Sequence, residues 1–297
     1  MISIGKRQFL LASTVAASVL FSGALPVAHA ASDWPAKPVT IVVGFSAGGP
    51  TDVVARILAE GLSNKFKQSF VVDNKAGASG AIAASAIKQA NPDGYTLMFG
   101  SSSTLSIIPT LQHTQYDPIK DFTAIGLVAS YPYFLVVPGP SPIQSLDELL
   151  AKGRDSSSKL TYASAGVGAV NHLAGEWFKH EAKIEATHIP YRGDSAAISD
   201  LIGSRVDFAF LAGAAVWPQV KSGNMRILAS ASATPGLAGE GGVTLGESRF
   251  KGFAAEPWNG VMGPAGMPQP IVEKLNAAIN EIMHRPEVVE RLEGMSQ

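Results

Sequence analysis

The chain has 297 residues, with 23 basic and 24 acidic side chains, a formal net charge of −1 and no cysteine. This near-neutral balance, without runs of Lys or Arg, argues against nucleic acid and anionic membranes as partners. The lack of cysteine excludes thiol catalysis, thiolate metal ligands and disulfide exchange. The length exceeds that of one average domain and predicts two domains.

The first thirty residues have the composition of an export signal. Lys6 and Arg7 give a positive start, residues 9–25 are apolar, and residues 28–30 form an A-x-A cleavage site. The apolar run is interrupted by serine and glycine and is too short for a good membrane span. We expect cleavage near Ala30 and a mature protein in the periplasm. That mature chain has 267 residues and a formal net charge of −3.

Strands and helices alternate along the mature chain. Apolar runs rich in β-branched residues predict strands at 39–45, 69–74, 95–103, 124–138 (with Pro132 inside it), 206–211 and 225–233. Helices are expected at 50–66, 80–90 and 145–153, and the segments 160–181 and 186–205 each have the pattern of a strand, a loop and a helix. The tail, 260–292, predicts a strand, a turn and helices. Such alternation is typical of α/β folds with parallel sheets.

The loop after the first predicted strand fits two catalytic motifs incompletely. Residues 44–48 match the G-x-S-x-G nucleophile elbow, but Ser46 follows the first strand of the mature chain instead of several strands. His172 and His188 are the formal candidates for its base, and neither stands in a recognisable context. Gly44 and Gly49 match the first half of a phosphate-binding P-loop, which then lacks its lysine. Nucleotide binding is not expected, and we predict no cofactor.

The same loop has the composition of a backbone anion site. Gly48 and Gly49 can expose backbone N–H groups, and Pro50 suits the first helical position. Thr51 and Asp52 fall in the first turn, where they complement the free N–H groups of the helix start. Residues 163–169, "ASAGVGA", form a second loop of this kind, followed by Asn171 and His172. Two such loops in opposing lobes are predicted to hold a small acid.

Seven segments together resemble a known family, the Bug-type periplasmic solute receptors of the tripartite tricarboxylate transporters. The segments are "WPAKPVTIVVGFSAGGPTDVVARILAEGL", "VVDNKAGASG", "NPDGYTLMFG", "YDPIKDFTAIGLVAS", "LTYASAGVGAVNHLAGEWF", "IPYRGDSAAISDLIGSRVDFAF" and "GPAGMPQPIVEKLN". They cover essentially the whole mature chain in order. The resemblance implies a two-lobed, type II-like α/β binding protein that closes around a small organic acid. Each lobe would be a mainly parallel sheet flanked by helices, and the monomer would meet two permease subunits transiently.

The resemblance also implies lobe boundaries and ligand contacts. The first lobe would comprise residues 31–131 and 254–297, and the second residues 132–253. First-lobe contacts would be Phe45, Ala47, Gly48, Gly49, Thr51, Asp52, Ser101, Ser102 and Thr104, with help from the loop at 74–80. Second-lobe contacts would be Ala165, Gly166, Gly168, Ala169, Val170, Asn171, His172, Tyr191, Gly193 and Leu211.

Several positions depart from the usual pattern of the family. Ala169 stands where relatives usually carry Ser or Thr, Leu105 and Ile108 replace a polar His and Asn, and Leu211 often corresponds to Asp. A buried polar ligand group without a partner costs about 1–3 kcal/mol. We therefore hypothesise a preference for a less polar acid, such as an aliphatic or aromatic monocarboxylate, over citrate. Relatives usually continue past Gln297 into a final helix, so a shortened C-terminus is expected.

The remaining candidates are weaker. The histidines form no ligand cluster with metal-binding spacing, and no metal site is expected. Asp194 and Glu256 are isolated carboxylates without an evident acid–base partner, and Trp258 is expected at a hinge or cleft edge. A transport receptor is the leading hypothesis. Its alternatives are a secreted serine hydrolase that uses Ser46 and a ligand-sensing adaptor for a membrane kinase.

Overall fold

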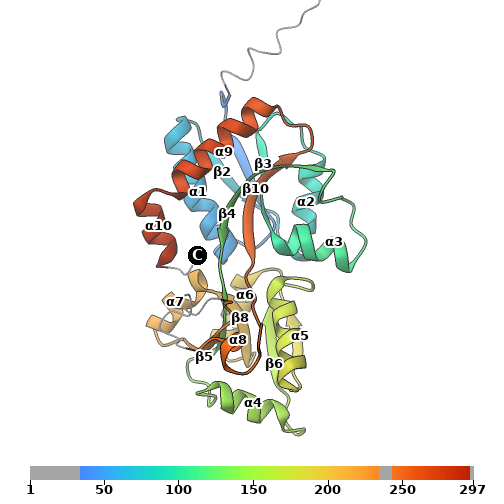
Figure 1. Ribbon diagram of the computed structural model, residues 1–297, viewed down its shortest axis with the longest axis vertical. Helices are drawn as coiled ribbons and strands as arrows, with labels where there is room; N and C mark the ends of the chain where they lie inside the picture. Colours follow the sequence, from blue (N-terminus) through green and yellow to red (C-terminus); the bar gives the residue numbers. More distant parts are fainter. Residues whose placement is uncertain (1–33, 234–242, 295–297) are drawn as a thin grey trace, which may run out of the picture. The chain divides into compact units, whose positions relative to one another are not determined.

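The computed structural model describes residues 34–233 and 243–294, so the predicted signal at 1–30 lies outside the described residues. From Trp34 onward the chain forms one compact unit that contains two five-stranded sheets (Figure 1). We call the first sheet with its helices the first lobe, and the second sheet with its helices the second lobe. This is the predicted two-lobed α/β architecture.

The first sheet has the strand order β2-β1-β3-β10-β4. Its strands are β1 (Val39–Val43), β2 (Phe70–Asn74), β3 (Thr96–Ser101), β4 (Phe122–Ser130) and β10 (Trp258–Pro264). β1 pairs in parallel with β2 and β3, and β10 pairs antiparallel with β3 and β4. Four strands therefore run in one direction, and only β10 is reversed.

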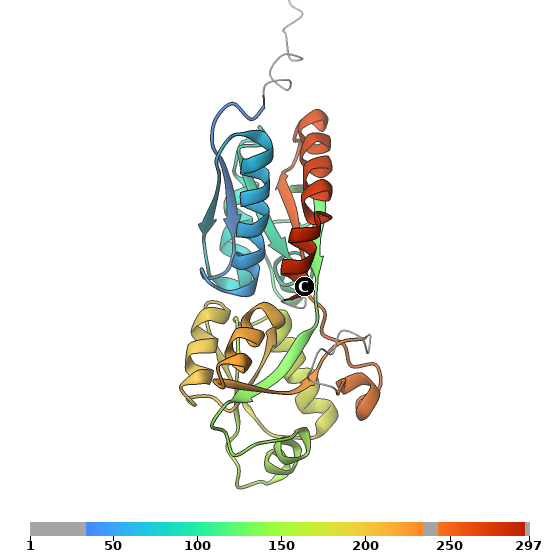
Figure 2. The same cartoon turned by 90° about the vertical axis from the view of Figure 1, so that its left-hand side faces the viewer.

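Helices cover both faces of the first sheet because β1 is apolar on both sides. Ile41 and Val43 pack with helices α1 (Pro50–Phe66) and α9 (Gln269–Met283), whereas Val42 packs with α2 (Ala81–Lys88). Figure 2 shows α1 and α9 side by side, with an ion pair between Lys65 and Glu281. The shorter helices are η1 (Ala78–Gly80), a π-helical turn η2 (Ser103–Ile107), α3 (Ile108–Leu111) and α10 (Pro286–Glu293).

The second sheet repeats this plan with the order β7-β6-β8-β5-β9. Its strands are β5 (Tyr133–Pro138), β6 (Thr161–Ser164), β7 (Thr187–Pro190), β8 (Phe208–Ala212) and β9 (Met225–Ser230). Its helices are α4 (Leu146–Arg154), α5 (Val170–Ala182), α6 (Asp194–Ile202), α7 (Gly213–Lys221) and α8 (Leu245–Ser248). β5 is the single reversed strand, since it is antiparallel to β8 and β9.

Two neighbouring segments of chain connect the sheets. The expected strand at 124–138 is in fact two strands, because the chain turns at Pro132 and leaves the first sheet for the second. The return segment lies beside it: Tyr131 N–H donates to the Pro257 carbonyl at 3.2 Å, and Tyr133 N–H donates to the Ala255 carbonyl at 3.0 Å. The predicted lobe boundaries, 31–131 with 254–297 and 132–253, remain a prediction.

Most predicted elements are confirmed, and the exceptions have local causes. Helix α1 begins at Pro50 as expected, because proline at the first helical position lacks only an N–H that no partner needs. Helix α7 was not predicted: Pro218 lies inside it, and proline usually signals a helix end. The tail after β3 is a π-helical turn, where strand and loop were expected.

Candidate functional site

The first loop, residues 44–49, joins β1 to α1. Gly49 caps α1 with extended backbone (φ −78°, ψ 167°) and no side-chain cap. Gly48, at φ +76°, donates its N–H to Asp52 Oδ2 at 2.9 Å. From the sequence we expected this N–H to be exposed for an anion. The structure instead uses it inside the loop, because the Asp52 carboxylate folds back onto its own helix start.

Asp52 holds the first loop through three donors. Besides Gly48, Arg56 Nε donates to Oδ2 at 2.8 Å and Asn74 Nδ2 donates to Oδ1 at 2.9 Å. Asn74 also donates to the Phe45 carbonyl at 3.1 Å, so it ties β2 to the loop. Burial alone raises the pKa of Asp52, but the hydrogen bonds from Arg56, Gly48 and Asn74 outweigh it and lower the pKa. Asp52 is thus an ionised anchor of the loop.

The second loop, residues 165–169, follows the same design between β6 and α5. Ala165 N–H donates to Asn171 Oδ1 at 3.1 Å, and Gly168 N–H donates to His172 Nδ1 at 3.2 Å. Both acceptors lie in the first turn of α5. In each lobe, therefore, polar side chains of the first helical turn fix the preceding loop.

His172 and His188 lie beneath the second loop as a stacked pair, with ring centroids 4.1 Å apart. His188 Nε2 lies 2.6 Å from Ser164 Oγ. Burial lowers the pKa of both imidazoles, and the neighbouring His172 helps to lower that of His188 to about 4. Both rings are therefore neutral at pH 7, and His172 orients the loop as an acceptor.

A third helix start, that of α6, meets the two loops and carries a buried carboxyl group. Gly193 (φ +143°, ψ 171°) precedes Asp194, which is only 6% exposed. Asn171 Nδ2 donates to Asp194 Oδ1 at 2.8 Å. Within residues 34–233 and 243–294 no other hydrogen bond reaches this carboxyl group, and burial raises its pKa to about 6.

Two tyrosines of the connecting segment stand near Asp194. Burial raises the pKa of Tyr131 and of Tyr133 far above the usual range, and the charge of Asp194 adds to both shifts. Tyr131 donates to Asn259 Oδ1 at 3.0 Å, whereas the Tyr133 hydroxyl has no hydrogen-bond partner in the described part of the chain. Sequence reasoning missed the two tyrosines and treated Asp194 as an isolated carboxylate without an evident partner. The position of Asp194 directly after "YRG" at a helix start was the available signal for its role.

The loops of the two lobes are joined across the site by hydroxyl groups. The hydrogen bonds are Ser46 Oγ with Ser195 Oγ (3.1 Å), Ser195 Oγ to the Ala47 carbonyl (2.7 Å), Ser79 Oγ to the Val167 carbonyl (2.7 Å) and Val170 N–H to Ser103 Oγ (3.0 Å). Ala165 and Ala169 of the second lobe also belong to the apolar cluster of the first lobe. The lobes are therefore closed upon each other.

The structure brings most of the predicted site residues to this junction. The first loop, the start of α1, the second loop and Gly193 all lie there, since they make the contacts described above. Thr104 supports it from below: its hydroxyl donates to the Ser79 carbonyl at 2.9 Å and lies 3.1 Å from Ser101 Oγ. Ser102 Oγ accepts the N–H of Trp258, the first residue of β10, at 3.4 Å.

Two predicted site residues have other surroundings. Leu211 is fully buried in the apolar cluster beneath α6 and pairs with Phe134 in the sheet. Only the side chain of Tyr191 lies away from the junction, since its hydroxyl donates to Asp200 Oδ2 at 2.7 Å. Its backbone lies at the second loop, because its N–H donates to the Ser164 carbonyl at 3.0 Å and a Cβ at Gly166 would lie 3.1 Å from its carbonyl oxygen. Of the two apolar replacements after β3, Ile108 is buried and faces the loop, because a Cβ at Gly168 would lie 2.4 Å from its Cδ1. Leu105 packs against the cluster around α2.

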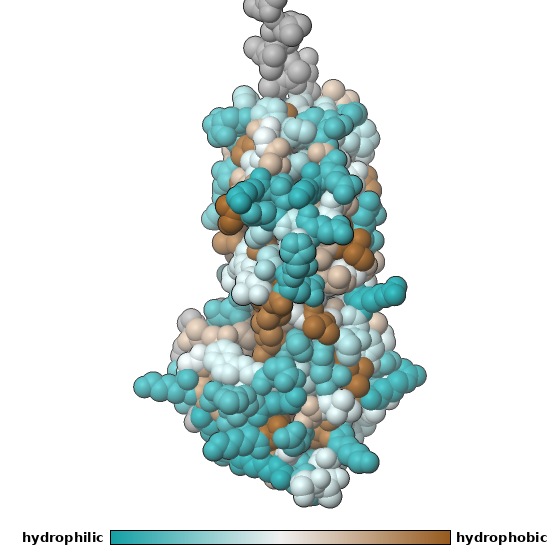
Figure 3. Space-filling model, turned by 90° about the vertical axis from the view of Figure 1, so that its right-hand side faces the viewer, coloured by the Kyte–Doolittle hydropathy of each residue, from teal (hydrophilic) through white to brown (hydrophobic). Residues whose placement is uncertain are grey.

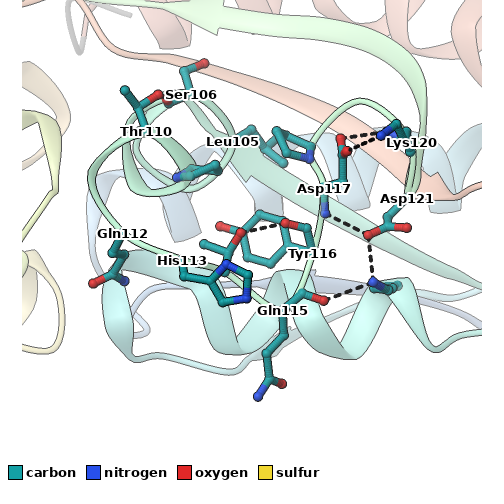
Figure 4. A pocket seen from close by; sticks show the side chains of 14 residues that line it. Leu105, Ser106, Thr110, Gln112, His113, Gln115, Tyr116, Asp117, Lys120 and Asp121 are labelled. Atoms are coloured by element: carbon teal, nitrogen blue, oxygen red, sulfur yellow. Dashed lines mark hydrogen bonds and ion pairs between the residues drawn. The ribbon is translucent and has the colours of Figure 1, made fainter.

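A separate hollow of about 770 Å³ lies in the first lobe around residues 105–121 (Figure 4). None of the predicted site residues lines it. Its charged groups pair among themselves, with Lys88 Nζ 2.9 Å from Asp121 Oδ2 and Lys120 Nζ 3.2 Å from Asp117 Oδ2. Since these charges are already compensated, the hollow has less to offer an ionic ligand than the junction of the loops.

The surface in Figure 3 is largely hydrophilic, with apolar side chains gathered near mid-height of the view. Leu111 and Val167 are large exposed apolar residues at the contact between Gly168 and the first lobe. Among the described residues, no group of three or more metal-ligating side chains occurs, and none of the helices is long and apolar enough to span a membrane.

Comparison with known sequences identifies the family. The family described as "Tripartite tricarboxylate transporter family receptor" matches residues 54–296. Protein BugT of Bordetella pertussis is 35% identical over 265 residues, which cover 88% of this chain and 80% of BugT. The UPF0065 protein in the tcbD-tcbE intergenic region of a Pseudomonas species is 33% identical over 294 residues, which cover 99% of this chain and 86% of that protein.

Solved structures agree with the sequences. The periplasmic binding protein BugD has a TM-score of 0.84 and 33% identity, covering 89% of this chain and 88% of BugD. An R. palustris protein solved with adipate has a TM-score of 0.84, 32% identity and the same coverage, 89% and 88%. MatC from Rhodopseudomonas palustris with bound malate has a TM-score of 0.82 and 29% identity over 89% of this chain and 90% of MatC. The chain therefore belongs to the receptor family of the tripartite tricarboxylate transporters, as its sequence motifs indicated.

Proposed function

We propose that this protein is a periplasmic receptor that binds a small carboxylic acid between its lobes and delivers it to the membrane subunits of a tripartite tricarboxylate-type transporter. Membership of the receptor family supports the delivery step. Two relatives of this fold were solved with adipate and with malate, which supports a carboxylate as the ligand. No turnover of the ligand is expected.

The observation that carries this proposal is the junction of the two loops. Each follows a strand of its own lobe and opens a helix, so the positive ends of the α1 and α5 dipoles converge there. The hydroxyl bridges from Ser46, Ser79 and Ser103 link the lobes around it. A ligand bound at this place would be enclosed by closure about the paired segments at 131–133 and 255–257.

The contacts of Ser46 argue against the hydrolase alternative. Its hydroxyl lies beside that of Ser195, which is not a general base. The two histidines considered as its base are engaged elsewhere, His172 with Gly168 and His188 with Ser164. The serine of the G-x-S-x-G match therefore serves the lobe contact.

The preference for a less polar acid over citrate is part of the proposal. Ile108 and Ala169 support it, since both are buried at the loop junction where hydroxyl or amide groups were expected from the family pattern. Calorimetric titration with citrate and with benzoate-like monocarboxylates tests this preference. Much tighter binding of citrate would contradict it.

Native mass spectrometry of protein purified from the periplasm tests the receptor function. One small acid bound at unit stoichiometry, released on unfolding and identified by its mass, is the expected result. A thermal-shift screen of mono- and dicarboxylates follows on protein stripped of ligand. If no acid raises the melting temperature, the proposal is wrong.

A further inference from the structure

Asp52 and Asp194 are the only charged side chains that are buried among the described residues. Asp52 has three donors, including Arg56, whereas Asp194 has a single amide donor, Asn171. An ionised carboxylate can accept about four hydrogen bonds, so Asp194 retains most of its capacity. The second oxygen of Asp194 is not among the fully buried side-chain atoms without a partner, so it remains within reach of water or of a donor on a ligand.

Asn171 and Tyr131 do not provide a further donor to Asp194. Asn171 is fixed, because its Oδ1 accepts the Ala165 N–H while its Nδ2 already faces Asp194. The Tyr131 hydroxyl donates to Asn259. Arg56, the cation that contacts the first loop's anchor, is bound to Asp52 and Asn74 on the first lobe.

Tyr133 offers the complementary group. Its side chain is 7% exposed, and its hydroxyl, a donor, has no partner among residues 34–233 and 243–294. It is near enough to Asp194 for the carboxylate charge to act on its pKa. One unused donor and one unused acceptor thus lie in the same buried region, next to the helix starts that attract a carboxylate.

We infer that Asp194 is a specificity-determining residue that selects acids carrying an ammonium group, so that the ligand is an amine-bearing carboxylic acid. The ammonium would donate to the free oxygen of Asp194, and the Tyr133 hydroxyl would donate to a ligand carboxylate. A plain acid places its negative charge near Asp194 without a compensating donor. The inference rests on the proposed function and names the ligand class of the same site.

The raised pKa of Asp194, about 6, agrees with this assignment because the group is ionised at pH 7 at a cost that a bound cation would offset. The assignment also agrees with the apolar replacement at Ile108. A ligand with one carboxylate and one ammonium group can have an otherwise apolar carbon skeleton, which would suit an apolar wall. The opposite arrangement, a protonated Asp194 donating to a plain carboxylate, is the competing case that the experiment must separate.

Isothermal titration of the mature protein with matched pairs tests the inference. The pairs are adipate with 2-aminoadipate, malate with its 2-amino analogue, and monocarboxylates with their ω- or 2-amino derivatives. We expect the amino member to bind at least about tenfold more tightly, the range of a charge-assisted hydrogen bond. Asp194→Asn is expected to remove this preference, and Tyr133→Phe to weaken both members of a pair equally.

Asp147→Asn is the matched control, because Asp147 also lies in a first helical turn, that of α4, but is exposed and paired with Arg249. It should leave the preference unchanged. Tighter binding of the plain acid by the native protein overturns the inference and leaves the receptor function intact. The inference is also overturned if the affinity of the native protein for the plain acid rises as the pH falls from about 8 to about 5, and if Asp194→Asn already shows that higher affinity at about pH 8. If no member of any pair binds, the receptor function itself fails.

Discussion

Asp52 and Asp194 occupy equivalent places, each in the first turn of a helix beside a glycine-rich loop, yet their surroundings differ. Asp52 is saturated by Gly48, Arg56 and Asn74, and its pKa is lowered, whereas Asp194 has one amide donor and a raised pKa. The Asp52 carboxylate fixes the first loop, and its hydrogen-bonding capacity is occupied by groups of the protein itself. The Asp194 carboxylate keeps unused acceptor capacity, as expected for a group that contacts a ligand.

The largest expected effect comes from removing the saturated carboxylate. Asp52→Ala leaves the Gly48 N–H without its acceptor, leaves Asn74 Nδ2 with the Phe45 carbonyl alone, and removes the partner of Arg56 Nε. Since hydrogen bonds to charged groups contribute about 1.5–3 kcal/mol each and are not additive, we expect a loss of about 3 kcal/mol in the free energy of unfolding. Urea unfolding measures it, with Asp147→Ala as the exposed control. A loss below about 1 kcal/mol would show that Asp52 is no anchor.

The unsaturated carboxylate should behave in the opposite way. Its pKa is about 6 in the folded protein against an ordinary value of 3.8. The folded state thus holds this proton more tightly, so ionisation of Asp194 lowers the free energy of unfolding. This loss is absent below about pH 4 and complete above about pH 6. Asp194→Asn should therefore raise the unfolding free energy of the ligand-free protein by up to about 3 kcal/mol near pH 7.5.

Thermal unfolding between about pH 4 and pH 8 tests this sign, because the gain from Asp194→Asn should disappear towards the acid end. A variant that is less stable than the native protein at neutral pH would mean that Asp194 has a partner that stabilises its charge. Gained stability together with lost ligand preference would show a functional group retained at a cost to the fold.

The residue before Asp194 provides a smaller effect on closure. Gly193 has φ +143°, and a Cβ there would lie 2.3 Å from Ser46 Oγ and 2.9 Å from Ser46 N in the opposite lobe. Gly193→Ala should therefore hinder closure and weaken ligand binding about thirtyfold, equivalent to roughly 2 kcal/mol. Titration with the best ligand measures the loss. Gly223→Ala is the matched control, since Gly223 also has positive φ (+76°) but no neighbour within 4 Å of an added Cβ.

The smallest expected effect is at Ser46. Ser46→Ala removes one neutral hydroxyl contact between the lobes, so affinity should fall about three- to tenfold, as expected for a single neutral hydrogen bond. An ester-hydrolysis assay on both proteins should show no serine-dependent activity. Hydrolysis by the native protein that the substitution abolishes would revive the nucleophile interpretation.

The sequence allowed the fold and the helix starts to be predicted, because they depend on local chemistry. Pro50 at the first position of α1 and the small residues of both loops lie where expected. The role of Asp194 could not be predicted in this way. Its meaning depends on Asn171, Tyr131 and Tyr133, which only the folded chain brings beside it.

The first loop shows the same limit from the other side. Glycines at a helix start do expose N–H groups to an anion, but this rule does not tell whether the anion is a ligand or a side chain of the protein. Here Asp52, four residues later, takes the N–H of Gly48. Sequence alone cannot distinguish a loop that receives a ligand from one that receives its own side chain, because both use the same residue types.

The hydroxyl bridges between the lobes have a consequence for the conditions under which the receptor works. Each ion pair of the described residues lies within a single lobe, and the hydrogen bonds across the junction are made by the hydroxyl groups of Ser46, Ser79, Ser103 and Ser195. Neutral hydrogen bonds are hardly affected by ionic screening, whereas ion pairs at a surface are. The balance between open and closed forms should therefore stay constant as external salt varies. Any dependence of the receptor's response on salt would then come from the charged contacts of the ligand and not from the contacts between the lobes.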